Sequence, residues 1–258
     1  MFDISRNKQI LKRASQINGF CFTSDVDWAS DCPIKLLVEY FKENNIPLTI
    51  FMTHSSAYLE SEKGNSKLEF GIHPNFIQPS TQGANIDEIV AYCHKVNPDA
   101  KAVRCHRWFS SNDIYENFLN IGIKYESNIC TGFNLVSPFI NRAGMVSFPT
   151  FFEDGAYLYH KLDLNFKHTK EMFSEKGLYV INMHPMHFAV NTPYFKYMRD
   201  IKDSMPPEEW NNLNKEKIAA MKYDGLGIHS YIEELVQYIQ VNNIPTYTLE
   251  EVYNYMLS

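Results

Sequence analysis

The stretch FCFTSDVDW, residues 20–28, joins a mostly apolar run to two aspartates and a tryptophan. Residues 19–24 are expected to form a buried β-strand, because the run is short, largely apolar and bounded by polar residues. Side chains alternate between the two faces of an extended chain, so Asp25 and Asp27 are expected to point to the same side. Two carboxylates on one side repel each other unless a positive group lies beside them. The sequence therefore predicts a positive partner for this pair, either a basic side chain or a metal ion.

Outward from this strand, short apolar runs alternate with longer segments of helical periodicity. Further strands are expected at residues 47–53, 68–73, 102–106, 122–128, 145–151, 178–183 and 244–248. Helices are expected at residues 34–45, 87–96, 112–121, 165–176, 230–243 and 249–257. This alternation is typical of βαβ units and a parallel sheet. About seven such units favour an α/β fold in which residues 1–258 form a single barrel domain.

Three local patterns add detail to this outline. Asp31 is a plausible N-cap for the helix at 34–45, with Pro33 in the first turn. Residues 60–67 are polar and are expected to form a loop. Residues 204–217 are polar and interrupted by proline, which predicts a surface excursion or a lid rather than core.

The composition excludes several classes of protein. The net charge is −6, and lysines and arginines are scattered, which disfavours nucleic acid as a partner. No apolar run approaches the ~18–20 residues of a membrane span, so no integral membrane segment is predicted. The first 16 residues lack the apolar core of a signal peptide. The five cysteines are odd in number and form no CxxC pair, which suits free thiols in a reducing cytoplasm.

Polar side chains that can bind a metal, transfer a proton or pair with a charge follow the ends of the predicted strands. They are Asp25, Asp27, Thr53, His54, His73, Arg104, His106, Glu153, Asp154, His184 and His187. Each alone has an ordinary interpretation, since aspartates are common in turns and most histidines are structural. The carboxyl ends of the strands of a parallel barrel share one mouth, where the active site lies. The joint pattern therefore predicts that these residues meet in a site, where His, Arg or a metal balances the carboxylates.

Five segments in this order resemble the motifs of polysaccharide deacetylases, the NodB-homology group or carbohydrate esterase family 4. They are FTSDVDW (22–28), EFGIHPNF (69–76), VRCHRWF (103–109), FPTFFEDG (148–155) and VINMHPMHFAVNT (180–192). The spellings GIHPNF and HPMHFAVNT are most similar to the WbmS-like branch, which is associated with surface-polysaccharide gene clusters. The resemblance implies a distorted (β/α)7 barrel of the NodB-homology type. It also implies a divalent metal, usually zinc, and hydrolysis of a linear C–N amide bond on an N-acylated sugar.

The resemblance also implies roles for individual residues. Asp25 matches the catalytic base, Arg104 the arginine that orients it and His184 the general acid. Asp27 and His73 match metal ligands. The residues predicted to bind the substrate are Trp28, His106, Trp108, Glu153, Asp154 and His187. The chemistry agrees with these roles, because a metal-bound water needs a base and a leaving amine needs an acid.

The sequence departs from the family pattern four residues after His73, where Ile77 replaces the second histidine ligand. Isoleucine cannot bind a metal, and two protein ligands are fewer than a zinc site needs. Candidate replacements are Gln82, His54, His106 and His187, of which Gln82 and His187 are favoured. A mixed set of oxygen and nitrogen ligands is also compatible with iron or manganese.

Three functions follow from this sequence. The first is a metal-dependent deacetylase of surface-polysaccharide biosynthesis. Because no export signal is found, its expected substrate is a nucleotide-linked or lipid-linked acylated sugar on the cytoplasmic side. The second is a non-catalytic carbohydrate-binding barrel that has lost its metal with the histidine at position 77. The third is an aminosugar deformylase, since pocket size alone can separate formyl from acetyl groups.

Overall fold

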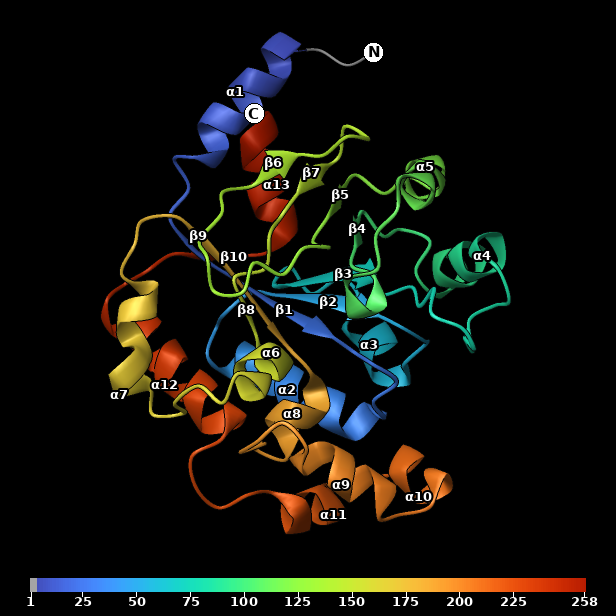
Figure 1. Cartoon of the computed structure of the whole chain (residues 1–258), viewed down its shortest axis with the longest axis vertical. Helices are drawn as coiled ribbons and strands as arrows, with labels where there is room; N and C mark the ends of the chain where they lie inside the picture. Colours follow the sequence, from blue (N-terminus) through green and yellow to red (C-terminus); the bar gives the residue numbers. More distant parts are fainter. Residues whose placement is uncertain (1–3) are drawn as a thin grey trace.

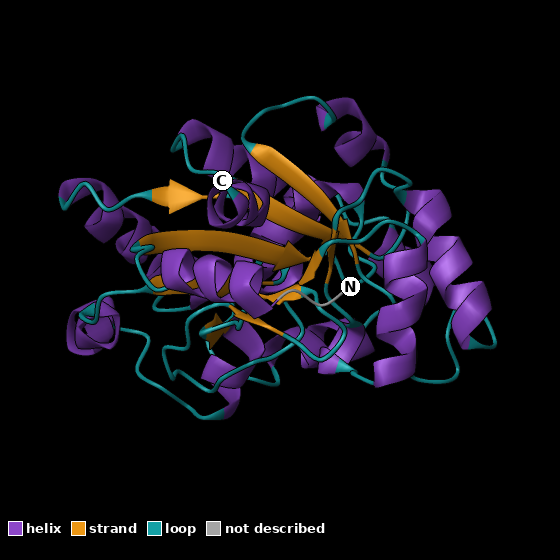
Figure 2. Ribbon diagram, turned by 90° about the horizontal axis from the view of Figure 1, so that it is seen from above, coloured by secondary structure: helices purple, strands orange, loops and turns teal. Residues whose placement is uncertain are grey.

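The computed structural model describes residues 4–258 and contains a ten-stranded sheet among them. The strands are β1 Gly19–Asp25, β2 Leu48–Met52, β3 Leu68–Ile72, β4 Ala102–Val103, β5 Tyr125–Glu126, β6 Phe139–Ile140, β7 Val146–Ser147, β8 Phe152–Glu153, β9 Leu178–Met183 and β10 Thr246–Tyr247. Their order is β6-β7-β5-β4-β3-β2-β1-β9-β8, and β10 pairs with β1. All these pairs are parallel except β6 with β7. The sheet curls, and helices surround it, as in the expected distorted β/α barrel (Figures 1 and 2).

Helices connect most of the strands. They are α1 Ile4–Ala14, α2 Asp31–Glu43, α3 Ala57–Glu62, α4 Ile86–Val96, α5 Asn112–Asn120, α6 Asp154–Tyr159, α7 Phe166–Thr169, α8 Pro185–Ala189, α9 Tyr197–Asp203, α10 Pro207–Asn211, α11 Lys215–Met221, α12 Ile228–Val241 and α13 Leu249–Leu257. Two 3-10 turns, η1 His106–Trp108 and η2 Lys170–Phe173, complete the set. No helix within residues 4–258 combines the length and the apolar character that crossing a membrane requires.

Strand β1 is buried along its whole length and divides the core in two. Phe20 and Phe22 point outward into the main cluster, where Phe22 packs on Phe41 of α2 with ring centroids 5.0 Å apart. Cys21 points inward to a second cluster, into which α13 inserts Leu249. The inward face changes character toward the carboxyl end, where buried Thr23 and Asp25 follow. An apolar floor therefore lies below a polar mouth.

One glycine allows close packing in the barrel interior next to this apolar region. A Cβ on Gly71 of β3 would lie 2.8 Å from the Phe51 ring and 2.8 Å from the Ala102 carbonyl oxygen. The Phe51 ring lies in turn 4.5 Å from the guanidinium carbon of Arg104. Gly71 thus leaves room for the aromatic ring that supports the buried arginine.

Several predicted boundaries were wrong. The run at 102–106 forms only the short β4, because the chain leaves the sheet at Cys105, whose amide donates to the Asn128 side chain over 2.9 Å. The predicted 165–176 helix is split into α7 and η2. The loop predicted at 60–67 begins inside α3, whose N-cap Ser56 accepts from the Leu59 amide.

The N-cap of α2 is Ser30, and Asp31 is its first helical residue. The Asp31 carboxylate instead accepts from the Ser56 hydroxyl over 2.5 Å, linking α2 to the start of α3. The segment 204–217 contains α10 and part of α11 and is not wholly a surface excursion. Trp210 and Leu213 of this segment are buried in the main core cluster.

Candidate active site

A buried arginine organises the mouth of the barrel. Arg104 is fully buried, and its five N–H groups make six hydrogen-bond contacts, one N–H of Nη1 being shared, with one backbone carbonyl and five side-chain oxygens. The acceptors belong to five residues on four segments: Thr23 and Asp25 of β1, the Ser127 carbonyl and hydroxyl, Thr150, and Asn182 of β9. Such a charge is stable in the interior only when its donors are satisfied, and here they are. Arg104 therefore fixes the strand ends relative to one another.

Asp25 is the charged partner of this arginine. Its Oδ1 accepts from Arg104 Nη1 over 3.1 Å, and its Oδ2 accepts from Asn182 Nδ2 over 2.8 Å. Asp25 is 4% exposed and is the last residue of β1, at the mouth of the barrel. Two donors on different oxygens hold the carboxylate in one orientation.

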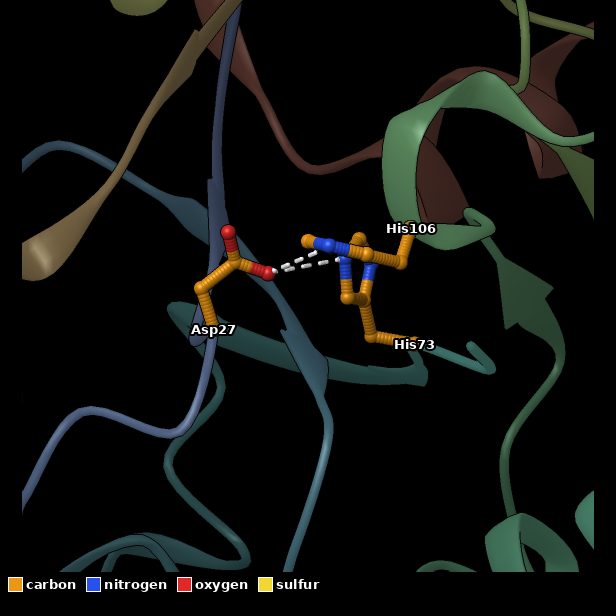
Figure 3. Close-up of side chains that lie close together, drawn as sticks. All are labelled: Asp27, His73 and His106. Atoms are coloured by element: carbon orange, nitrogen blue, oxygen red, sulfur yellow. Dashed lines mark hydrogen bonds and ion pairs between the residues drawn. The ribbon is translucent and has the colours of Figure 1, made fainter. Parts of the chain in front are cut away.

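Asp27 lies close to two histidines, His73 and His106 (Figure 3). Its Oδ1 is 2.9 Å from Nδ1 of His106 and 3.2 Å from Nε2 of His73. Burial alone would raise the pKa of Asp27, but hydrogen bonds with His106 and His73, together with the charges of His184 and His73, lower the pKa well below its ordinary value. The cluster of Asp27, His73 and His106 is called the ligand cluster below.

The ligand cluster depends on an unusual turn. Asp27 and Trp28 both have left-handed backbone conformations, with φ of 46° and 58°. The amide of Trp28 donates to the Thr53 hydroxyl over 3.2 Å, which anchors this turn to the end of β2. The carboxylates of Asp25 and Asp27 both approach His73, at 3.7 and 3.2 Å, although Asp27 lies beyond the strand.

His73 carries the clearest sign that the ligand cluster holds something. The residue is 1% exposed, and apart from the Asp25 and Asp27 carboxylates its ring nitrogens have no hydrogen-bond partner among the described residues. A buried imidazole whose two nitrogens both face carboxylates calls for an explanation such as an ion. One carboxylate oxygen and two imidazole nitrogens, all within 4.8 Å of one another, are donors that suit zinc, iron or manganese. The residues present therefore fit a divalent metal.

A second acid–base pair lies beside the ligand cluster. Asp154 is fully buried and accepts from the His184 backbone amide over 2.7 Å, and its other oxygen lies 2.6 Å from His184 Nδ1. The other ring nitrogen, Nε2, lies 3.5 Å from Asp27 Oδ2. Burial alone would lower the pKa of His184, but the charges of Asp154, Asp27 and Glu153 raise it well above its ordinary value.

The geometry thus contains a held carboxylate, a cluster of metal-binding type and an oriented histidine at one mouth. A family model of WbmS-like polysaccharide deacetylases matches residues 22–202, which is more than half of the chain. The chain belongs to this family.

Comparison with solved structures agrees with the fold. WbmS of Bordetella bronchiseptica, to which a polysaccharide deacetylase function in O-antigen biosynthesis has been ascribed, is 22% identical. The alignment covers 85% of this chain and 90% of WbmS, with a TM-score of 0.76. This likeness shows a shared NodB-type barrel and thereby confirms the predicted fold class.

Two weaker likenesses involve the wider group. A structure from Mycobacterium smegmatis, also ascribed to a polysaccharide deacetylase, is 15% identical, covers 89% of this chain and 92% of its own, and has a TM-score of 0.47. A family CE4 pseudoenzyme from Bacillus anthracis is 10% identical, with coverages of 92% and 65% and a TM-score of 0.47. No curated protein matches the chain.

Among the candidate replacements for the family's second histidine, the structure places His106, and not the favoured Gln82 or His187, beside Asp27 and His73. Ile77 is 36% exposed, and His106 is the residue beside Asp27 and His73. The Gln82 amide is occupied by three backbone groups. His187 lies on the other side, near Asp154 and His184, with its Nδ1 3.0 Å from the Thr192 hydroxyl.

Two predicted substrate contacts have other partners in the structure. Asp154 is wholly buried behind His184, so its side chain holds the histidine rather than facing a substrate. Glu153 caps α6 by accepting from the amides of Gly155 and Ala156 over 3.1 and 2.5 Å. Burial and the adjacent Asp154 charge raise the pKa of Glu153 to about 7.

The remaining predicted contacts lie around the ligand cluster. The Trp28 ring lies edge-on to His106, with centroids 5.2 Å apart. The Trp108 ring lies 5.2 Å from the guanidinium carbon of Arg104. Both tryptophans are partly exposed, which leaves their role in substrate binding a prediction.

Sequence reasoning missed the polar residues that hold Arg104 and Asp25. Asn182 contacts both, with its Oδ1 2.5 Å from Arg104 Nη1. Its signal is visible in the sequence, because an asparagine interrupts the apolar strand LYVINM two residues before His184. Thr23 has a similar place in FCFTSD, but a buried threonine in a strand is too common to single out.

Proposed function

We propose that the chain is a metal-dependent hydrolase that removes an N-acetyl or similar acyl group from a sugar in surface-polysaccharide biosynthesis. The observation that carries the proposal is His73, whose two buried ring nitrogens face the carboxylates of Asp25 and Asp27 and have no other hydrogen-bond partner among the described residues. The ascribed role of WbmS in O-antigen biosynthesis supports the biological context.

Asp27, His73 and His106 would hold the metal, with zinc the first candidate and iron or manganese the alternatives. A bound divalent ion at this place would polarise an amide carbonyl and lower the pKa of a water. The imidazole of His106 thereby takes the role that the missing histidine at position 77 has in the wider family. This substitution argues against the non-catalytic alternative, because the loss at Ile77 is compensated from another loop.

Asp25 is proposed as the base that accepts a proton from the attacking water. Its carboxylate is held by Arg104 and Asn182 from below, and its Oδ1 lies 3.7 Å from His73 at the ligand cluster. A base fixed in this way needs no reorientation when the proton arrives. Asn182→Ala should therefore impair Asp25 even though Asn182 itself takes no proton.

His184 is proposed as the acid that protonates the leaving amine. Its Nδ1 is occupied by Asp154, so the proton must be delivered from Nε2, which points toward Asp27 at the ligand cluster. The negative charge of buried Asp154 favours the protonated imidazole that this step requires.

The proposed substrate is an acylated sugar linked to a nucleotide or a lipid, processed in the cytoplasm. Trp28 and Trp108 border the ligand cluster and offer aromatic faces on which a sugar ring can stack.

The proposal is tested by acetate release from a panel of N-acetylated nucleotide sugars, using metal-loaded wild type and Asp25→Asn. We expect turnover by the wild type and a loss of about 10²- to 10⁴-fold in kcat for the variant, typical of removing a general base. Equal rates of acetate release by the two proteins would contradict the proposed mechanism.

The same panel separates the alternatives. An N-formylated set, assayed for formate, identifies a deformylase if formate release exceeds acetate release. Sugar binding by calorimetry with no release of either acid would favour the non-catalytic carbohydrate-binding barrel.

A further inference from the structure

Gln82 lies in the loop between β3 and α4 and is 4% exposed. Its Nε2 donates to the carbonyl oxygens of Thr53 over 2.9 Å and His73 over 3.1 Å. Its Oε1 accepts from the Asn75 amide over 2.6 Å. One side-chain amide thus joins the end of β2 to the segment that follows β3.

These three backbone groups lie where the strand ladder between β2 and β3 ends, at Met52 paired with Ile72. Beyond that point neighbouring strands no longer satisfy each other's polar groups, so the carbonyls of Thr53 and His73 need another donor. A glutamine offers two N–H donors and one acceptor oxygen on a planar group, which matches two carbonyls and one amide.

Each member of the ligand cluster is connected to this junction. His73 is bound directly through its carbonyl oxygen. The Asp27–Trp28 turn is bound through Thr53, whose hydroxyl accepts from the Trp28 amide. His106 is bound through Pro74, whose carbonyl accepts from the His106 amide over 2.9 Å.

We infer that Gln82 is a positioning residue that sets the spacing of Asp27, His73 and His106 and thereby the metal affinity of the ligand cluster. The inference rests on the proposed function, because it takes these three residues to be the metal ligands. Gln82 does not contact the metal; it acts through the backbone of the residues that do. Residues that orient metal ligands typically change affinity by about 10- to 100-fold when removed.

Asn97, the C-cap of α4, supplies a matched control that also bonds to β3. It is 3% exposed, and its Nδ2 donates to the carbonyl oxygen of Phe70 in β3 over 2.7 Å. Asn97→Ala therefore removes a buried amide–carbonyl bond of similar strength at the middle of β3, whereas the Gln82 bonds lie beyond the carboxyl end of that strand.

The test is Zn²⁺ titration calorimetry on metal-free wild type, Gln82→Ala, Gln82→Met and Asn97→Ala, with the Tm of each metal-free protein. We expect both Gln82 variants to bind Zn²⁺ about 10- to 100-fold more weakly and Asn97→Ala to bind within about twofold of the wild type. All three should have a lower Tm. Gln82→Met keeps the side-chain volume, so it remains informative if the alanine variant does not fold.

Two outcomes would overturn the inference alone. One is wild-type Zn²⁺ affinity in both Gln82 variants; the other is an equal loss in Asn97→Ala, which would indicate general destabilisation. Failure of the underlying proposal looks different, because the wild type itself would then bind no Zn²⁺.

Discussion

At the scale of single residues, the site is built from pairs in which one side chain holds another. Arg104 and Asn182 hold Asp25, and Asp154 holds His184. The holding residues are fully buried, so they act from inside the barrel on groups at its mouth. This arrangement predicts that a buried residue with no substrate contact can be as important for turnover as the residue it holds.

Asp154→Asn tests this prediction. The asparagine can still accept from the His184 amide, but it places an NH₂ group or an uncharged oxygen beside Nδ1 and removes the charge that favours imidazolium. We expect a loss of about 10²- to 10⁴-fold in kcat with little change in KM, measured by acetate release.

An exposed pair of the same type provides the control. His168 Nδ1 lies 2.7 Å from an Asp163 oxygen, and both side chains are more than half exposed. Asp163→Asn should leave kcat unchanged. A kcat in Asp154→Asn that matches the control would contradict the role given to His184.

The motif residues of the site were predictable one by one, because each follows a recognisable strand and keeps its order in the chain. The sequence named His106 as one of four candidate ligands but did not place it beside His73, because no spacing rule connects the two residues. The place of His106 is set by the Pro74 carbonyl, which accepts from the His106 amide only once β3 and β4 are paired. The contacts of Gln82 were not predictable for a related reason, since its partners are backbone groups that the sequence does not display.

At the scale of elements, two turns of the same kind carry the ligand cluster. Asp27 and Trp28 form one, and Arg107 and Trp108 of η1 form the other, with φ of 53° and 57° in the second. A left-handed conformation costs a residue other than glycine about 1–2 kcal/mol. Such strain is often found where it places functional side chains, and these two turns carry the proposed metal ligands Asp27 and His106.

Arg107→Gly should relieve part of this strain. Arg107 is exposed and lies at φ 53°, ψ 34°, a region that glycine adopts without steric cost. We expect the free energy of unfolding to rise by about 1 kcal/mol in urea denaturation, with unchanged Zn²⁺ affinity.

Arg107→Ala is the matched control, because it removes the same side chain but keeps a Cβ in the left-handed region. The glycine variant should be the more stable of the two. Equal stability would show that the η1 turn carries no backbone strain at this position.

At the scale of the whole molecule, the barrel has a polar mouth above a floor that also contains a buried acid. Glu69 of β3 accepts from Tyr125, Thr49 and the Glu250 amide over 2.7–2.9 Å. Burial raises the pKa of Glu69 above its ordinary value of 4.5, although these hydrogen bonds oppose the shift. The folded chain therefore holds this proton more tightly than the unfolded chain does.

A raised carboxyl pKa stabilises the fold below the unfolded value, and that stability is lost as the pH rises through the folded value. Glu69→Gln removes this pH dependence of stability. The glutamine can keep the three partners of Glu69, since the hydroxyl oxygen of Tyr125 can accept a hydrogen bond from the new NH₂ group. We expect the free energy of unfolding of the variant, minus that of the wild type, to increase between about pH 5 and about pH 8.

Glu60→Gln, at a surface pair with Lys63, serves as the control. Its free energy of unfolding, minus that of the wild type, should change little between about pH 5 and about pH 8. A difference for Glu69→Gln that decreases with pH would contradict the direction of the Glu69 shift.

The overall architecture was largely predictable, whereas the extent of the shorter strands was not. Long buried strands such as β1, β2 and β9 have clear apolar patterns, and they lie side by side toward the β8 edge of the sheet. Strands β4, β5 and β7 lie where strands were predicted but have two residues each, and the two-residue strands β6 and β8 were not predicted, because two residues are too few for any periodicity. The helices α9 to α11 lie together beyond α8 (Figure 1), and buried Trp210 and Leu213 show why a polar segment still packs on the core.

The central claim is that Asp27, His73 and His106 hold one catalytic metal. The most direct measurement is metal content by inductively coupled plasma mass spectrometry on untagged wild type, His106→Ala and the surface control His168→Ala, all purified without chelators. The account predicts about one zinc, iron or manganese per chain in the wild type and in His168→Ala, and a large loss in His106→Ala. A wild type without metal after equilibration with these ions, or a His106→Ala variant with full occupancy, would contradict it.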